Sequence, residues 1–96
     1  MLTQIVPRIW AGDASDANTE ENQNRFHSVE ATLDVYRCAR EILWWAWGHN
    51  EDVLVWSFNS HRVESVLAYF MVECMAFTDR SAREFIRAKI AQIQKQ

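Results

Sequence analysis

The chain has 96 residues, of which 49% are hydrophobic, and it carries a formal net charge of −3. This length fits one small domain, and five Trp supply enough apolar surface for a single core. No stretch approaches the about 20 apolar residues of a membrane span, and the first residues lack the basic and then apolar pattern of a signal peptide. We therefore expect one cytoplasmic domain over residues 1–96, with no membrane partner.

The cysteines and the distribution of charge exclude further classes of protein. Cys38 and Cys74 have no metal-ligand spacing, so we expect reduced thiols and neither a metal site nor another cofactor. Basic side chains gather in residues 80–96, where Glu84 is the single acid, and such a short run either suits a partner or, as we favour, solvates a terminal helix. Without zinc spacing or a basic region interleaved with aromatics, nucleic acid is not an expected partner.

Two short extended pieces open the chain, one at Ile5 and one at residues 9–11, on either side of Pro7. Gly12-Asp13 has the chemistry of a turn and is expected to close them. In the polar stretch over residues 18–25, the first positions hold N-cap residues and acids that favour a first helical turn. We therefore expect a short exposed helix, whose cap and first-turn candidates are Asn18, Thr19, Glu20 and Glu21.

Residues 28–33 predict a strand, and from Val35 the apolar period lengthens to that of a helix that Gly48 ends as its C′ residue. The buried face of this helix is expected at Val35, Cys38, Ala39, Ile42, Leu43 and Ala46. One apolar stripe cannot bury all the indoles that follow, which are Trp44, Trp45 and Trp47. We expect at least one half-exposed indole, which either lies flat over a neighbouring element or forms a protein-binding or homo-oligomer interface.

Residues 53–56 form a continuous apolar run, which is typical of a strand buried on both faces. A helix follows, with a buried face at Val63, Val66, Leu67, Phe70, Met71 and Cys74. Thr78 or Ser81 caps a last helix, residues 81–84 having the form of a capping box. Its buried face is expected at Ala82, Phe85, Ile86, Ile90 and Ile93. The alternation predicts an α/β fold with a small, mostly parallel sheet flanked by helices, whose carboxyl edge is the natural binding edge.

The segment from residue 57 to residue 62 lies at that edge, between the buried strand and the next helix. Free backbone N–H groups and the helix dipole favour an anion at such a position, and Arg62 adds a bidentate donor. His61 is a candidate base, although a lone loop histidine is more often a surface residue. We therefore expect an anion-binding loop formed by Ser57, Asn59, Ser60, His61 and Arg62.

Several motifs resemble, in their order, the framework of the dual-specificity, tyrosine-type protein phosphatases. Residues 53–57 read Val-Leu-Val-Trp-Ser and residues 67–71 read Leu-Ala-Tyr-Phe-Met; in that family such a pair brackets the Cys-x5-Arg-Ser loop that wraps phosphate. Residues 5–17 are similar to the family's first segments, residues 29–35 to its next strand and residues 82–87 to its final helix. The resemblance covers most of the chain in patches and implies a reduced phosphatase-like domain.

The chemistry of that family does not carry over with the framework. Ser57 stands at the position of the nucleophilic cysteine, and the following loop is shorter than the family's and has no glycine to let backbone approach an anion. The segment that carries the family's general acid is missing, with Asp34 the only candidate nearby. Serine without an activating acid–base pair is a poor nucleophile. We therefore expect a non-catalytic module that binds a phosphorylated or acidic group or a protein partner.

A second cysteine signature leaves an enzymatic alternative open. Cys74, Arg80 and Ser81 satisfy Cys-x5-Arg-Ser, which implies an active phosphatase with a non-standard loop. However, Cys74 falls on the apolar stripe of the preceding helix, so we expect a buried thiol with a raised pKa. Asp79 beside Arg80 would also repel a phosphate dianion. A joint between two helices is the simpler interpretation of this segment.

Overall fold

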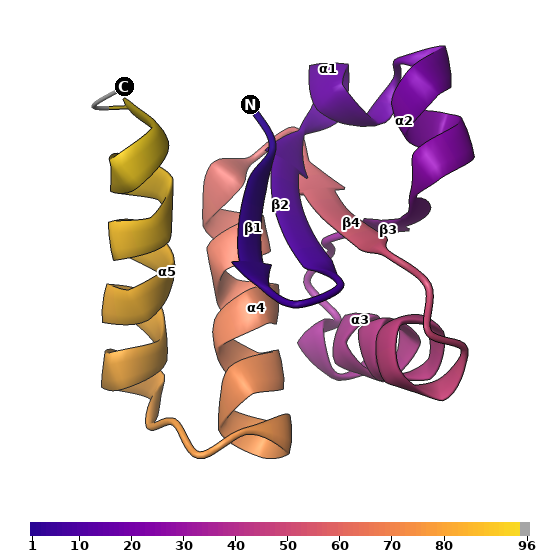
Figure 1. Cartoon of the computed structure of the whole chain (residues 1–96). Coiled ribbons are helices and arrows are strands. Elements are labelled where there is room, and N and C mark those ends of the chain that lie inside the picture. The colour runs from indigo at the N-terminus through magenta and orange to yellow at the C-terminus, as the bar shows by residue number, and fades with distance from the viewer. Residues whose placement is uncertain (95–96) are drawn as a thin grey trace.

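A computed structural model describes residues 1–94, and their side chains as far as residue 92. Four strands form one sheet in the order β1-β2-β4-β3 (Figure 1). β1 is antiparallel to β2, whereas β2 and β3 both run parallel to β4. The prediction of a small α/β domain with a mostly parallel sheet is therefore confirmed. The strands are β1 (Thr3–Val6), β2 (Ile9–Asp13), β3 (His27–Glu30) and β4 (Val53–Ser57).

Helices cover both faces of this sheet unequally. The larger core lies between one face and the longer helices, and Figure 1 shows α4 and α5 side by side in this layer. A smaller apolar cluster lies on the other face, where α1 and α2 pack. The helices are α1 (Ala14–Ala17), α2 (Glu20–Arg25), α3 (Val35–Ile42), the π-helix η1 (Leu43–Gly48), α4 (Ser60–Cys74) and α5 (Asp79–Gln94).

The central strand β4 explains why residues 53–56 read as a continuous apolar run. Val53 and Val55 are buried in the larger core, whereas Leu54 points to the opposite face and packs with Ala17 and Phe26. Because successive side chains of a strand alternate between the two faces, only a strand covered on both sides needs apolar residues at every position. The sequence prediction for this strand is confirmed.

The two extended pieces flank Pro7 as predicted, but the turn predicted at Gly12-Asp13 is wrong. Pro7 and Arg8 make the turn between β1 and β2, with Arg8 at a φ of 70°. Gly12 and Asp13 instead continue β2, and Asp13 caps α1 by accepting a hydrogen bond from the Asp16 N–H. Gly12 is needed for space rather than for a turn, because a Cβ atom there would lie 3.0 Å from the Asp16 carboxylate and 3.1 Å from a Leu54 methyl.

The other predicted elements are confirmed with shifted ends. Thr19 caps α2 by accepting a hydrogen bond from the Asn22 N–H. The strand predicted over residues 28–33 ends at Glu30, because the chain turns there toward α3, which Asp34 caps. Gly48 does not act as a C′ residue, since it closes η1 without a positive φ, and Asn50 takes the left-handed conformation instead, at a φ of 56°.

α5 begins at Asp79, two residues before Ser81, which is one of its two predicted caps. The Thr78 hydroxyl accepts from the Ser81 N–H at 3.1 Å, and the Ser81 hydroxyl accepts from the Thr78 N–H at 3.0 Å. These reciprocal bonds make Thr78 the cap, so the capping box predicted at residues 81–84 is wrong. Ala82 and Ile86 are buried as predicted, Phe85 and Ile90 are partly buried, and Ile93 lies outside the described side chains. Among the described helices, none is long and apolar enough to cross a bilayer.

Candidate functional site

The carboxyl edge of the sheet holds a shorter loop than the sequence predicts. β4 ends at Ser57 and α4 begins at Ser60, so only Phe58 and Asn59 connect them. The side-chain oxygen of Asn59 accepts a hydrogen bond from the His61 N–H at 2.9 Å. The backbone carbonyl of Asn59 accepts one from the Arg62 N–H at 3.0 Å. Two of the donors that an anion would need are therefore already used by the cap.

Three of the five predicted anion-binding residues meet at this edge. Ser57, Ser60 and His61 line a hollow of about 560 Å³ between the sheet and the two long helices. Asn59 and Arg62 do not line it, and Arg62 lies exposed on the first turn of α4. The bidentate contact expected from Arg62 is therefore not aimed into this hollow.

The charges around the hollow are mostly acidic or already paired. Asp13 lies opposite Ser57 in the β2–β4 register. A hydrogen bond from the Ser15 hydroxyl, followed by one from the Asp16 N–H, holds the pKa of the Asp13 carboxyl well below its usual range. Arg87 also lines the hollow, but it donates to the Glu64 carboxylate at 2.8 Å. Anion binding at this edge rests on Ser60 and His61 and stays a prediction.

The Cys74 signature spans two helices and has no strand in front of it. Cys74 is the last residue of α4 and is half-buried rather than buried as predicted. Burial, and then the neighbouring Glu73 carboxylate, raise the pKa of its thiol. Arg80 is 90% exposed on α5 and pairs with Glu84 at 3.3 Å. The helix carbonyls at the end of α4 oppose a thiolate and a phosphate alike. The arrangement is that of a joint between two helices.

A different surface gathers exposed aromatic side chains on the outer side of α3 and η1. Trp44 and Trp47 are 59% and 42% exposed, and Tyr36 and Leu43 are 57% and 40% exposed. The prediction of at least one half-exposed indole is therefore confirmed, whereas the predicted burial of Leu43 is wrong. We call Tyr36, Leu43, Trp44 and Trp47 the aromatic surface.

The three indoles of η1 differ in their burial. Ile42 and Ala46 are fully buried in the larger core and Trp45 packs against it partly buried, whereas Trp44 and Trp47 are exposed. Trp45 stacks on His27, with ring centroids 3.9 Å apart, and thus lies flat on a neighbouring strand. Segments of π-helix are rare and frequently occur at functional sites.

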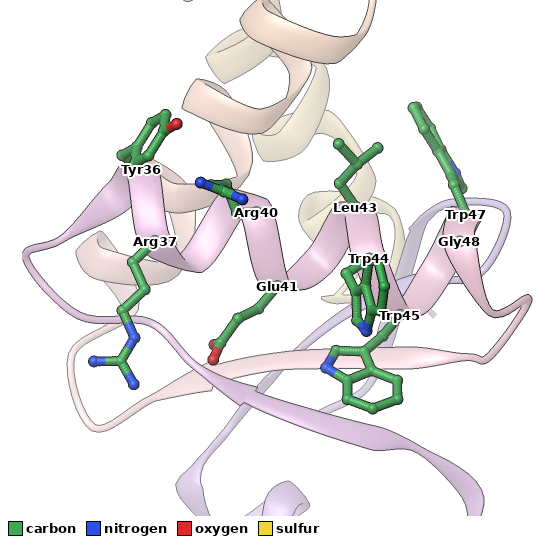
Figure 2. Close-up of a pocket in the computed structure, with 9 residues that line it drawn as sticks. All are labelled: Tyr36, Arg37, Arg40, Glu41, Leu43, Trp44, Trp45, Trp47 and Gly48. Atoms are coloured by element: carbon green, nitrogen blue, oxygen red, sulfur yellow. The ribbon is translucent and has the colours of Figure 1, made fainter.

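The side chains of this surface border an open groove of about 800 Å³. Figure 2 shows Tyr36, Arg40, Leu43 and Trp47 along one side of the helix, and Arg37, Glu41, Trp44 and Trp45 along the other. The spacing 36, 40, 43, 47 follows one helix face. Sequence reasoning missed Tyr36 as part of the surface, although this spacing was the signal that could have found it.

Two guanidinium groups border the groove without a carboxylate partner. Within residues 1–94, neither Arg37 nor Arg40 takes part in an ion pair. The Arg40 guanidinium lies 5.7 Å from the centroid of the Tyr36 ring, within reach of a cation–π contact. Both cations therefore remain available to a partner.

Other side chains of the protein contact the Trp44 and Trp47 rings, so these rings are positioned before a partner binds. The Trp47 ring packs edge to face on buried Phe70, with centroids 5.2 Å apart. The His49 ring lies 4.6 Å from Trp44, and its Nδ1 atom lies 3.1 Å from the Trp44 carbonyl oxygen. Such support limits the conformational entropy that binding would cost.

Comparisons with models of protein families and with curated proteins gave no match. The resemblance to dual-specificity phosphatases therefore rests on the sequence motifs and on their order along the chain. A common origin with that family stays a hypothesis.

Proposed function

We propose that this protein is a non-catalytic protein-binding module, built on a reduced phosphatase-like domain, that docks a partner through the aromatic surface. One observation carries this proposal: Tyr36, Leu43, Trp44 and Trp47 all lie at least 40% exposed beside one groove. Most of the described apolar side chains are buried in the two cores or pack against them. Large apolar side chains that are exposed together, rather than scattered singly, favour an interaction site.

The composition of the groove is that of a protein-binding hot spot. Trp, Tyr and Arg are the residue types that contribute most often to binding energy at interfaces, and all three border it. The two cations beside the rings add polar contacts that fix orientation. Lys is depleted from such interfaces, and none of the described lysines borders the groove.

The surroundings of the two candidate nucleophiles support the non-catalytic part of the proposal. The Ser57 hydroxyl accepts a hydrogen bond from the Asn59 N–H at 3.1 Å and serves the turn before α4. The Cys74 thiol has a raised pKa at the end of a helix, which lowers its thiolate fraction at neutral pH. An assay with an aryl phosphate should give no turnover above background. Turnover that disappears in Cys74→Ser would contradict the non-catalytic part of the proposal.

Selection of peptide binders from a library of random sequence tests docking through the aromatic surface. An unconstrained phage-displayed peptide library is selected on the wild-type protein, and the enriched peptides are then measured against Trp44→Ala. Truncation of a central interface indole costs about 2 kcal/mol or more, so we expect affinity to fall by at least about tenfold. Phe58→Ala is the matched control, because Phe58 is 81% exposed outside the groove. Enriched peptides that ignore Trp44 would overturn the proposal.

A further inference from the structure

We infer that the aromatic surface takes an acidic amphipathic helix of a partner protein. The inference rests on the proposed function and adds the chemistry and the shape of the partner. Three properties of the groove carry it: its free cations, its helical backbone and its length.

The charge of the groove is opposite to that of the molecule. The chain has a net charge of −3, yet Arg37 and Arg40 border the groove against the single acid Glu41. Neither guanidinium is paired within residues 1–94, in contrast to Arg83 and Arg87, which share the Glu64 carboxylate. Guanidinium groups bind carboxylates through two parallel hydrogen bonds, so a partner with Asp or Glu beside its apolar residues satisfies them.

The backbone behind the groove favours a helix over an extended segment. α3 and η1 use their backbone N–H and C=O groups within the helix and offer no free edge to a strand. A docked segment must therefore satisfy its own backbone groups, as a helix does. Its apolar face would lie on the rings, with contact positions three and four residues apart.

The length of the groove matches about three turns of such a helix. Tyr36 and Trp47 mark its two ends, and a helical segment of this length spans roughly 16 Å. The three rings and Leu43 are each about half exposed. With about 150–250 Å² for an aromatic side chain, they offer roughly 400 Å² of apolar surface.

A second copy of the chain fits this surface less well. An isologous interface brings the same patch from both copies together. The groove has two arginines against the single acid Glu41, so its excess of positive charge would face itself. Like charges facing each other across an interface oppose association. An acidic helix does not meet this objection.

The test compares two libraries of displayed helical peptides. Both fix Leu at positions spaced three and four residues apart over three turns; one carries Asp or Glu and the other Lys or Arg at the flanking positions. We expect the acidic library to yield binders to the wild-type protein with on the order of tenfold higher affinity than the basic library. This preference should shrink at high salt, because exposed charges are then screened.

Charge reversal supplies the matched variant. Arg37→Glu combined with Arg40→Glu should reverse the preference, so that basic peptides bind more tightly than acidic ones. The control combines Arg62→Glu with Arg80→Glu, which makes the same change in net charge at two exposed arginines outside the groove. The control should keep the acidic preference. Circular dichroism verifies that both variants are folded.

The outcomes separate this inference from the proposed function. Binders that depend on Trp44 but show no acidic preference, or one that the control abolishes equally, overturn the acidic helix and leave the docking surface. A dimer in size-exclusion chromatography with light scattering that Trp44→Ala dissolves identifies a second copy as the occupant, which also overturns it. The lack of any Trp44-dependent binder overturns both.

Discussion

The outer faces of α5 and of α3–η1 are both helical, exposed and rich in arginine, but they differ in whether the arginines form ion pairs. On α5 the guanidinium groups are neutralised within the chain: Arg80 pairs with Glu84, and Arg83 with Asp79. On α3 neither Arg37 nor Arg40 has such a partner within residues 1–94, and aromatic rings lie beside them. The number of basic residues therefore says little about where a partner binds.

Pairing of charges distinguishes a solvated face from a binding face. From the sequence, the basic run of residues 80–96 either suits a partner or solvates a terminal helix, and we favour the second interpretation. In the fold, Glu64 of α4 reaches across to Arg83 and Arg87, so these cations contribute to helix packing. The cations of α3 have no such role, and the predictions below test this difference.

The largest expected effect separates the inner and outer sides of α3–η1. Ile42 is fully buried, so Ile42→Ala should lower the free energy of unfolding by about 2–5 kcal/mol. The next residue, Leu43, faces the groove, and Leu43→Ala should cost less than about 1 kcal/mol. Urea denaturation of the two variants measures both values. Equal losses would mean that the aromatic surface is part of the stabilising core.

A smaller effect is expected from the carboxylate that joins α4 to α5. Glu64→Gln should cost about 1 kcal/mol, because the guanidinium groups of Arg83 and Arg87 lose their charged partner but stay partly hydrated. Glu84→Gln is the control, since its pair with Arg80 is exposed on both sides and should contribute at most about 0.5 kcal/mol. If both variants lose the same stability, the ion pairs of Glu64 with Arg83 and Arg87 contribute no more than an exposed surface pair.

The same carboxylate predicts a dependence on pH. Burial opposes ionisation of Glu64, but hydrogen bonds from Arg87 and then Arg83 outweigh it and hold the pKa of its carboxyl below the ordinary value. Its contribution is therefore fully present above the unfolded-state pKa of about 4.3 and is lost as the pH falls through the folded-state pKa. The difference in unfolding free energy between wild type and Glu64→Gln should be constant from neutral pH to about 5.5 and shrink below about 4. A difference that grows in acid would contradict the assignment.

The smallest effect leaves stability unchanged and concerns access to the indoles. Iodide should quench Trp44 and Trp47, which are exposed beside two cations, more than Trp45, which stacks on His27. Single Trp→Phe variants at the three positions assign the quenchable emission. Loss of quenching in the Trp45 variant alone would show that Trp45 is the accessible indole and that Trp44 and Trp47 are covered.

Much of the scaffold was predictable because it depends on neighbours in the sequence. The run at residues 53–56 indicated a strand covered on both faces, and the apolar spacing from Val63 to Met71 indicated the buried side of α4. Thr19 and Thr78 were each one of two caps that the sequence offered for their helices. In each case the deciding contact lies within one element, so local periodicity reports it.

The candidate sites were harder to predict because the deciding contacts are distant in sequence. The expected anion-binding loop at residues 57–62 reduces to two connecting residues, since Asn59 starts α4 early. Helical spacing placed Leu43 in the core, whereas in the structure it is 40% exposed beside fully buried Ile42. The period of a helix does not report how far neighbouring elements cover its apolar stripe.

By itself, the sequence determined the α/β class, the central strand and the presence of more indoles after Val35 than one helix face can bury. Only the tertiary structure decided which indoles remain open, because Trp45 is covered by His27 and Trp47 is held by Phe70, both from other elements. It also decided which arginines are free, since Glu64 neutralises cations that lie about 20 residues further along the chain. Residue type and spacing are local properties, whereas exposure and charge pairing depend on partners that only the folded chain brings together.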